Sequence, residues 1–70
     1  MLNDPIEHAW ETTVGSQTPE EFVRLSVEDG CESLEQAAAD YAKWAAWECG
    51  ADEELVREAV MVKCAGLWPA

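Results

Sequence analysis

Start and stop signals for helices recur four times along this chain, and they constrain its fold more than any other feature of the sequence. Each start is a residue whose side-chain oxygen can accept a hydrogen bond from the first helical turn. These expected N-caps are Asp4, Thr18, Ser33 and Asp52. Each stop is a glycine, which adopts the left-handed backbone of a helix end without steric strain, at positions 15, 30, 50 and 66. The signals predict four helices, over residues 5–14, 19–29, 34–49 and 53–65.

Neighbouring residues strengthen the first three starts. Proline follows both Asp4 and Thr18, at the first helical position, where its missing N–H costs nothing. Glu21 stands three residues after Thr18, and Gln36 three residues after Ser33, so that each pair is expected to form a capping box.

Apolar residues recur at helical spacing within the four segments, and no alternation of useful length predicts a strand. In the longest segment the expected apolar face consists of Leu34, Ala37, Ala38, Tyr41, Ala45 and Cys49. The linkers are short enough to force successive helices to pack against each other. We therefore expect one domain over residues 1–70. It should be an all-α, compact four-helix mini-bundle, with an αα-hairpin formed by the helices over 34–49 and 53–65.

Charge excludes several classes of protein. The chain carries 15 acidic and 4 basic residues and a formal net charge of −11, which disfavours direct binding to nucleic acid phosphates. An apolar fraction of 49% with four tryptophans is too high for a disordered acidic tail. No apolar run approaches the roughly 20 residues that span a membrane, so no membrane association is expected, and no secretory signal is visible.

The three cysteines, Cys31, Cys49 and Cys64, are widely spaced and odd in number, so they predict no disulfide framework. This usage favours a reducing, cytoplasmic setting. A zinc site formed with His8 would lack the close ligand pair that zinc sites usually have. We expect the cysteines to be small buried apolar residues, and we expect neither a metal nor a cofactor.

No arrangement of residues indicates an enzyme. His8 is the one histidine, beside Ala9 and Trp10, and nothing in the sequence sets a nucleophile beside it. There is no glycine-rich phosphate loop and no calcium-binding loop pattern. With 15 acidic residues, close carboxylate pairs arise by chance and predict no acid–base catalysis.

Many of the acidic residues have a structural explanation. Negative charge in a first helical turn is stabilising, and this accounts for Glu7, Glu20, Glu21, Glu35, Glu53 and Glu54. Arg24 is placed to pair with Glu20 and Glu28. Arg57 is placed in the same way beside Glu53 and Glu58.

Other acidic residues lie where the helix dipole disfavours them. Glu28 and Asp29 fall in the last turn of the second segment and Glu48 in the last turn of the third, and Glu32 and Glu35 extend the first group. One interpretation is solubility through mutual repulsion. The other is that these charges are kept for a basic partner surface. Under the second interpretation the expected partner-binding residues are Glu28, Asp29, Glu32, Glu35, Asp40, Trp47, Glu48, Asp52, Glu54 and Glu58.

Trp47 falls outside the apolar face of its helix, while Trp44 lies on the shoulder of that face. Trp47 either covers a small core or packs against the C-terminal tail near Trp68, or it is an aromatic anchor for a partner.

In size, charge and lack of a catalytic motif the chain resembles the small acidic proteins that phages encode against host defence. It is closest in character to the anti-CRISPR inhibitors that act as DNA mimics. The resemblance rests on the acidic strings Glu28-Asp29-Gly30-Cys31-Glu32 and Asp52-Glu53-Glu54. It implies stoichiometric inhibition, by binding the basic surface with which a CRISPR surveillance complex or nuclease recognises DNA.

A different class of function is also open. The chain is alternatively a small helical adaptor or antitoxin-like partner that binds through Trp47 and Trp68, with a homodimer as one form of that contact. A regulatory subunit of an enzyme is a third option. Binding that weakens steeply with salt would favour the acidic mimic, and binding that changes little would favour the adaptor.

Overall fold

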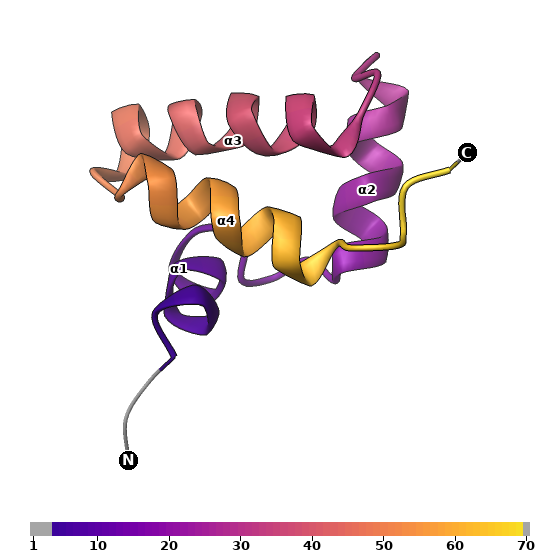
Figure 1. Ribbon diagram of the computed structural model, residues 1–70. Coiled ribbons are helices and arrows are strands. Elements are labelled where there is room, and N and C mark those ends of the chain that lie inside the picture. The colour runs from indigo at the N-terminus through magenta and orange to yellow at the C-terminus, as the bar shows by residue number, and fades with distance from the viewer. Residues whose placement is uncertain (1–3, 70) are drawn as a thin grey trace.

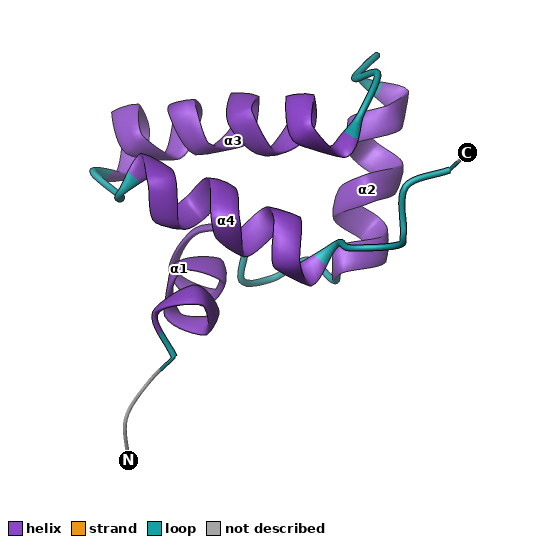
Figure 2. Cartoon of the chain, viewed as in Figure 1, coloured by secondary structure: helices purple, strands orange, loops and turns teal. Residues whose placement is uncertain are grey.

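The computed structural model describes residues 4–69, and within that range the chain is helical with no strand (Figure 2). The helices are α1 (Pro5–Thr13), α2 (Pro19–Glu28), α3 (Leu34–Cys49) and α4 (Glu53–Lys63). The predicted all-α fold is therefore confirmed, and the predicted ends differ from the observed ones by two residues at most. Figure 1 shows α3 and α4 running side by side as the expected antiparallel hairpin, with α2 across its open end and α1 against α4.

All four predicted N-caps accept a backbone hydrogen bond from the first turn of their helix. The donor–acceptor distances are 2.9 Å for Ile6 to Asp4, and 3.1 Å for Glu21 to Thr18, Gln36 to Ser33 and Leu55 to Asp52. In a capping box the side chain of Gln36 would also accept from the backbone N–H of Ser33. Its amide oxygen instead accepts from the backbone N–H of the preceding residue, Glu32, at 2.9 Å. That bond fixes the chain as it enters α3.

Glycine is required most strictly at the end of α1. Gly15 has a φ of +33°, and a Cβ at this position would lie 2.6 Å from the carbonyl oxygen of Glu11. Any other residue would therefore clash with the helix that it ends. The turn is tight enough to send the chain back towards α2.

The centre of the fold is the contact between α3 and α4. Ala38, Ala42 and Ala45 of α3 are completely buried, as is Val60 of α4. Small side chains on α3 let the two helices approach closely, and the valines of α4 fill the remaining space. The alanine-rich composition of α3 is thus a packing feature of the hairpin.

Aromatic rings join the hairpin to the first two helices. Trp10 of α1 lies edge to face with Phe22 of α2 at 6.0 Å between ring centroids, and Phe22 lies edge to face with Tyr41 of α3 at 5.2 Å. Such edge-to-face contacts add to the stabilisation that burial of the rings provides. The row continues to Trp44, whose ring centroid is 5.5 Å from that of Tyr41 and whose side chain reaches the surface.

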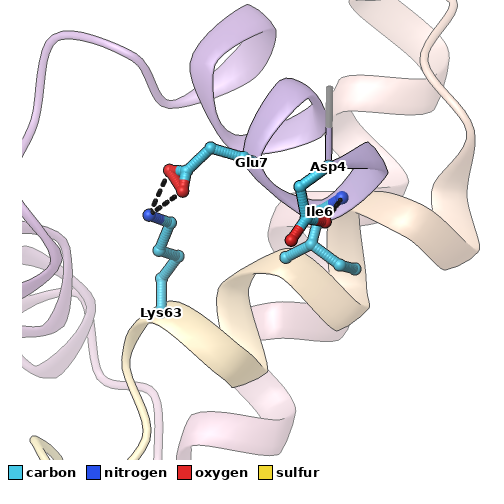
Figure 3. A network of polar contacts seen from close by, with 4 residues as sticks. All are labelled: Asp4, Ile6, Glu7 and Lys63. Carbon is cyan, nitrogen blue, oxygen red and sulfur yellow. Dashed lines mark hydrogen bonds and ion pairs between the residues drawn. The ribbon is translucent and has the colours of Figure 1, made fainter. Parts of the chain in front are cut away.

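An ion pair joins α1 to the last turn of α4. The ammonium group of Lys63 donates to both carboxylate oxygens of Glu7 (Figure 3). The sequence explained Glu7 only by its position in the first turn of α1, and the pairing with Lys63, 56 residues away, was not predicted. Glu7 therefore stabilises both the helix and the contact between the two helices.

No helix within the described range has the length and apolar character needed to cross a bilayer.

Candidate partner-binding surface

All ten residues expected to bind a partner are exposed. The structure places them in two groups around the two ends of α3, with Asp40 in the middle of this helix and Trp47 in its last turn, directly before Glu48. We call the first group, at the connection between α2 and α3, the corner: it consists of Glu28, Asp29, Glu32 and Glu35. The second group, which begins at the turn of the hairpin, is the hairpin end: it consists of Glu48, Asp52 and Glu54, together with Glu58 in the middle of α4. At 1.5 Å per residue, about 20 Å of helix axis separates Glu35 from Glu48.

The corner contains charge that the helix ends do not offset. Glu28 is the last residue of α2 and Asp29 its C-cap, and neither this helix nor α3 has a basic residue in its last turn. The helix dipole disfavours an anion at these positions. Glu28 is partly compensated by Arg24, whose guanidinium lies 3.7 Å from its carboxylate.

Three predicted ion pairs, one of Arg24 and two of Arg57, are wrong. Arg24 pairs with Glu21 at 3.7 Å rather than with Glu20. Arg57, expected to pair with Glu53 and Glu58, forms no ion pair with any residue in the range 4–69. The reason is the same in both cases: at an exposed helix surface such a pair gains little over hydration, so sequence spacing alone does not enforce it.

Cations therefore contact few of the carboxylates. Of the four basic residues, only Arg24 and Lys63 form ion pairs in the described part of the chain. Their acidic partners are Glu7, Glu21 and Glu28, out of 15 acidic residues. All the other acidic side chains are exposed and have no cation within ion-pair distance in this range.

A hollow of about 320 Å³ lies between α2 and α3, and the sequence did not predict it. Phe22 and Tyr41 contribute aromatic surface to it, and Asp29 and Asp40 contribute carboxylates. Burial, and then the negative charges of Asp40 and Asp29, raise the pKa of the thiol of Cys31, which also lines the hollow. Two of the expected partner-binding residues thus share one concave site.

Trp47 does not cover the core, and that interpretation of the sequence is wrong. Its side chain is 85% exposed, and Trp44, one turn earlier on α3, is 50% exposed. Trp68 by contrast is half-buried against the core, in a tail that Figure 1 shows running beside α2, away from the end of α3 that carries Trp47. The tail follows α2 because Leu67 and Pro69 lie near Val23 and Val27. The exposed aromatic surface is therefore formed by Trp44 and Trp47, not by Trp47 and Trp68.

The cysteines differ in environment, and the expectation that all three are buried is only partly right. Cys64 is buried, and burial raises the pKa of its thiol to about 11. Cys31 is half-buried and Cys49 is exposed. Cys49 is the last residue of α3, directly before the C-cap Gly50 at the turn of the hairpin. All three are free thiols.

His8 is exposed on α1, and it lines a hollow of about 290 Å³ that also contains Asp52. No group of three histidine, cysteine or acidic residues that could hold a metal ion is found between residues 4 and 69.

Comparison of the chain with protein-family models, with curated proteins and with solved structures finds no match.

Proposed function

We propose that this protein is a stoichiometric inhibitor of a host defence complex. It would bind, as an acidic mimic of DNA, the basic surface with which a CRISPR surveillance complex or nuclease recognises nucleic acid. The observation that carries the proposal is the small share of carboxylates that contact a cation: three of 15 within residues 4–69. A fold that needed its acidic residues only for internal pairing would not leave so many of them exposed.

The spacing of the two acidic groups supports this proposal. The corner and the hairpin end are held about 20 Å apart by the rigid helix α3. DNA advances about 3.4 Å per nucleotide along one strand, so this separation matches the length of roughly six nucleotides. Two fixed clusters of negative charge at that distance could occupy a groove whose lysine and arginine residues are arranged for phosphates.

The mode of action would be occupancy rather than catalysis. Complementary charge would speed the encounter with the partner, and exposed aromatic residues would slow dissociation. We propose that the protein acts in the cytoplasm, where its target would be found, and that it binds no nucleic acid itself.

The test uses a purified CRISPR surveillance complex loaded with fluorescent target DNA. Adding the wild-type protein should release the DNA in proportion to the amount added. The triple variant Asp29→Asn, Glu32→Gln, Glu48→Gln should release about tenfold less at equal concentration, mainly because association is slower at low salt. A charge-matched control, the variant Glu11→Gln, Glu20→Gln, Glu53→Gln, should release DNA as wild type does.

The proposal fails if the protein and DNA occupy the complex together, or if the triple variant displaces DNA as well as wild type.

The exposed pair Trp44 and Trp47 favours a second function, that of a helical adaptor that binds an apolar partner surface. Large apolar side chains that are this exposed often mark a contact site. In an adaptor the variant Trp47→Ala should abolish binding, and the triple acidic variant should bind normally. A homodimer through the same face would be detected by analytical ultracentrifugation, and Trp47→Ala should convert it to monomer.

A further inference from the structure

We propose that the hollow between α2 and α3 receives an arginine side chain of the partner protein. This inference rests on the proposed function, because it takes the partner surface to be basic. It adds a specific site to what would otherwise be a diffuse attraction between charges.

The shape and the aromatic content of the hollow suit a guanidinium group. Its volume of about 320 Å³ accommodates a long side chain. The half-buried ring of Tyr41 offers aromatic surface in the wall, and the buried ring of Phe22 lies edge to face with it, at 87° and 5.2 Å between ring centroids. A planar guanidinium stacks on aromatic rings more favourably than a compact, strongly hydrated ammonium does. Leu25, 37% exposed, adds apolar surface for the methylene groups of the arginine side chain.

The polar groups of the hollow suit the same ligand. Asp29 lies at the end of α2 and Asp40 in the middle of α3, so the carboxylates approach the site from two different helices. The effect of both carboxylates on the pKa of Cys31 supports their convergence on one region. Arginine carries five N–H donors in a fixed fork, which can reach two carboxylates at once. Gln17 and Ser26 also line the hollow and offer further acceptor oxygens.

Nothing within the described range competes for this position. No basic residue lines the hollow, and neither Asp29 nor Asp40 has an ion-pair partner or a side-chain hydrogen bond among residues 4–69. The site therefore presents negative charge and aromatic surface together, with no internal cation to neutralise it.

The test is a titration of the isotopically labelled protein with N-acetyl-arginine methylamide, followed by two-dimensional NMR of the backbone amides. We expect saturable shifts confined to the segments that line the hollow, at Gln17 and over residues 22–31 and 37–41. The variant Asp40→Asn should weaken binding about three- to tenfold, as expected for the loss of one charge-assisted hydrogen bond. Glu11→Gln removes the same charge from the exposed surface of α1 and should leave the affinity unchanged. Circular dichroism checks that both variants remain folded, and Asp29→Asn serves as a second variant of the same site.

Three results would overturn the inference: shifts spread evenly over the acidic surface, equal weakening by Asp40→Asn and Glu11→Gln, or equal affinity for N-acetyl-lysine methylamide titrated in the same way. Its failure is distinguishable from failure of the DNA mimic. If the arginine compound binds diffusely while the protein still displaces DNA, the arginine site is wrong and mimicry stands. If the arginine compound binds in the hollow but DNA is not displaced, mimicry is wrong and the site stands as a binding site for arginine.

Discussion

Carboxylates are used differently on the two sides of this bundle. On the side of α1 and α4, Glu7 is paired with Lys63, and the pair joins two helices that are far apart in sequence. On the side of α2 and α3, Asp29, Glu32 and Asp40 are exposed and contact no cation within residues 4–69. The chain thus contains an ion pair that joins two helices on one side, whereas at the corner only Glu28 is paired, with Arg24 of its own helix. Asp29, Glu32 and Glu35 of the corner do not stabilise the fold by ion pairing within residues 4–69, which makes them candidates for function.

Replacing Phe22, whose ring contacts both α1 and α3, should have the largest effect on the free energy of unfolding. Phe22 is buried and contacts both Trp10 and Tyr41, so Phe22→Ala should lower the free energy of unfolding by about 3–5 kcal/mol. That loss is comparable with the whole stability of many small domains. Urea unfolding followed by circular dichroism measures it. Trp47→Ala, at the exposed end of α3, should change stability by less than about 0.5 kcal/mol. Similar losses for the two variants would contradict the assigned core.

Alkaline pH should lower the free energy of unfolding through the buried thiol of Cys64. The pKa of Cys64 is about 11 in the folded protein and 9.0 without burial, so the unfolded chain loses this proton first as pH rises. The stability that Cys64 contributes is complete below pH 9.0 and is lost progressively towards pH 11. Urea unfolding between pH 9.0 and about pH 11 should show that the free energy of unfolding falls more steeply with pH in wild type than in Cys64→Ala. Cys49→Ala, which changes an exposed thiol, should retain the wild-type slope, and an equal slope in Cys64→Ala would contradict the account.

The ion pair between α1 and α4 should be worth more than the pair at the corner. The side chain of Lys63 is 28% exposed, whereas that of Arg24 is 61% exposed and more strongly hydrated. A double-mutant cycle with Glu7→Gln and Lys63→Met should give a coupling of about 0.5–1 kcal/mol. The matched cycle with Arg24→Met and Glu28→Gln should give less than about 0.5 kcal/mol. Equal coupling energies would contradict the claim that the pair of Glu7 and Lys63 contributes more to stability than the pair of Arg24 and Glu28.

Neutralising the corner should have the smallest effect on stability, and with the opposite sign. Asp29→Asn with Glu32→Gln should leave the melting temperature unchanged or slightly raised, because repulsion between like charges falls. Glu20→Gln and Glu53→Gln, in the first turns of α2 and α4, should each lower stability by about 0.3–1 kcal/mol. A clear loss of stability in the corner variant would show that its carboxylates have a structural role.

The helices were predictable because their signals are local. Each N-cap acts on a backbone group within three residues of itself, so a short window of sequence contains both partners. The hollow was not predictable, because Asp29 and Asp40 are brought together only by the turn between α2 and α3. The pair of Glu7 and Lys63 depends on how α1 packs against α4, which no local pattern specifies.

In the candidate surface, too, some features followed from the sequence and others depended on how the chain packs. The exposure of Trp47 followed in part from its angular position on α3, but the position of Trp68 depended on where the tail runs after Gly66. Helical periodicity wrongly placed Cys49 in the core, because periodicity carries no information about where the opposing helix begins.

The most direct test of the central claim is the salt dependence of binding to a CRISPR surveillance complex. The dissociation constant of the wild-type protein should rise at least about tenfold between ~50 and ~200 mM salt, because its exposed carboxylates would replace phosphates on a basic surface. The triple variant Asp29→Asn, Glu32→Gln, Glu48→Gln should show a shallower dependence, and Trp47→Ala should weaken binding without changing the slope. A dissociation constant that changes less than about twofold over this range would contradict the acidic mimic and favour the apolar adaptor.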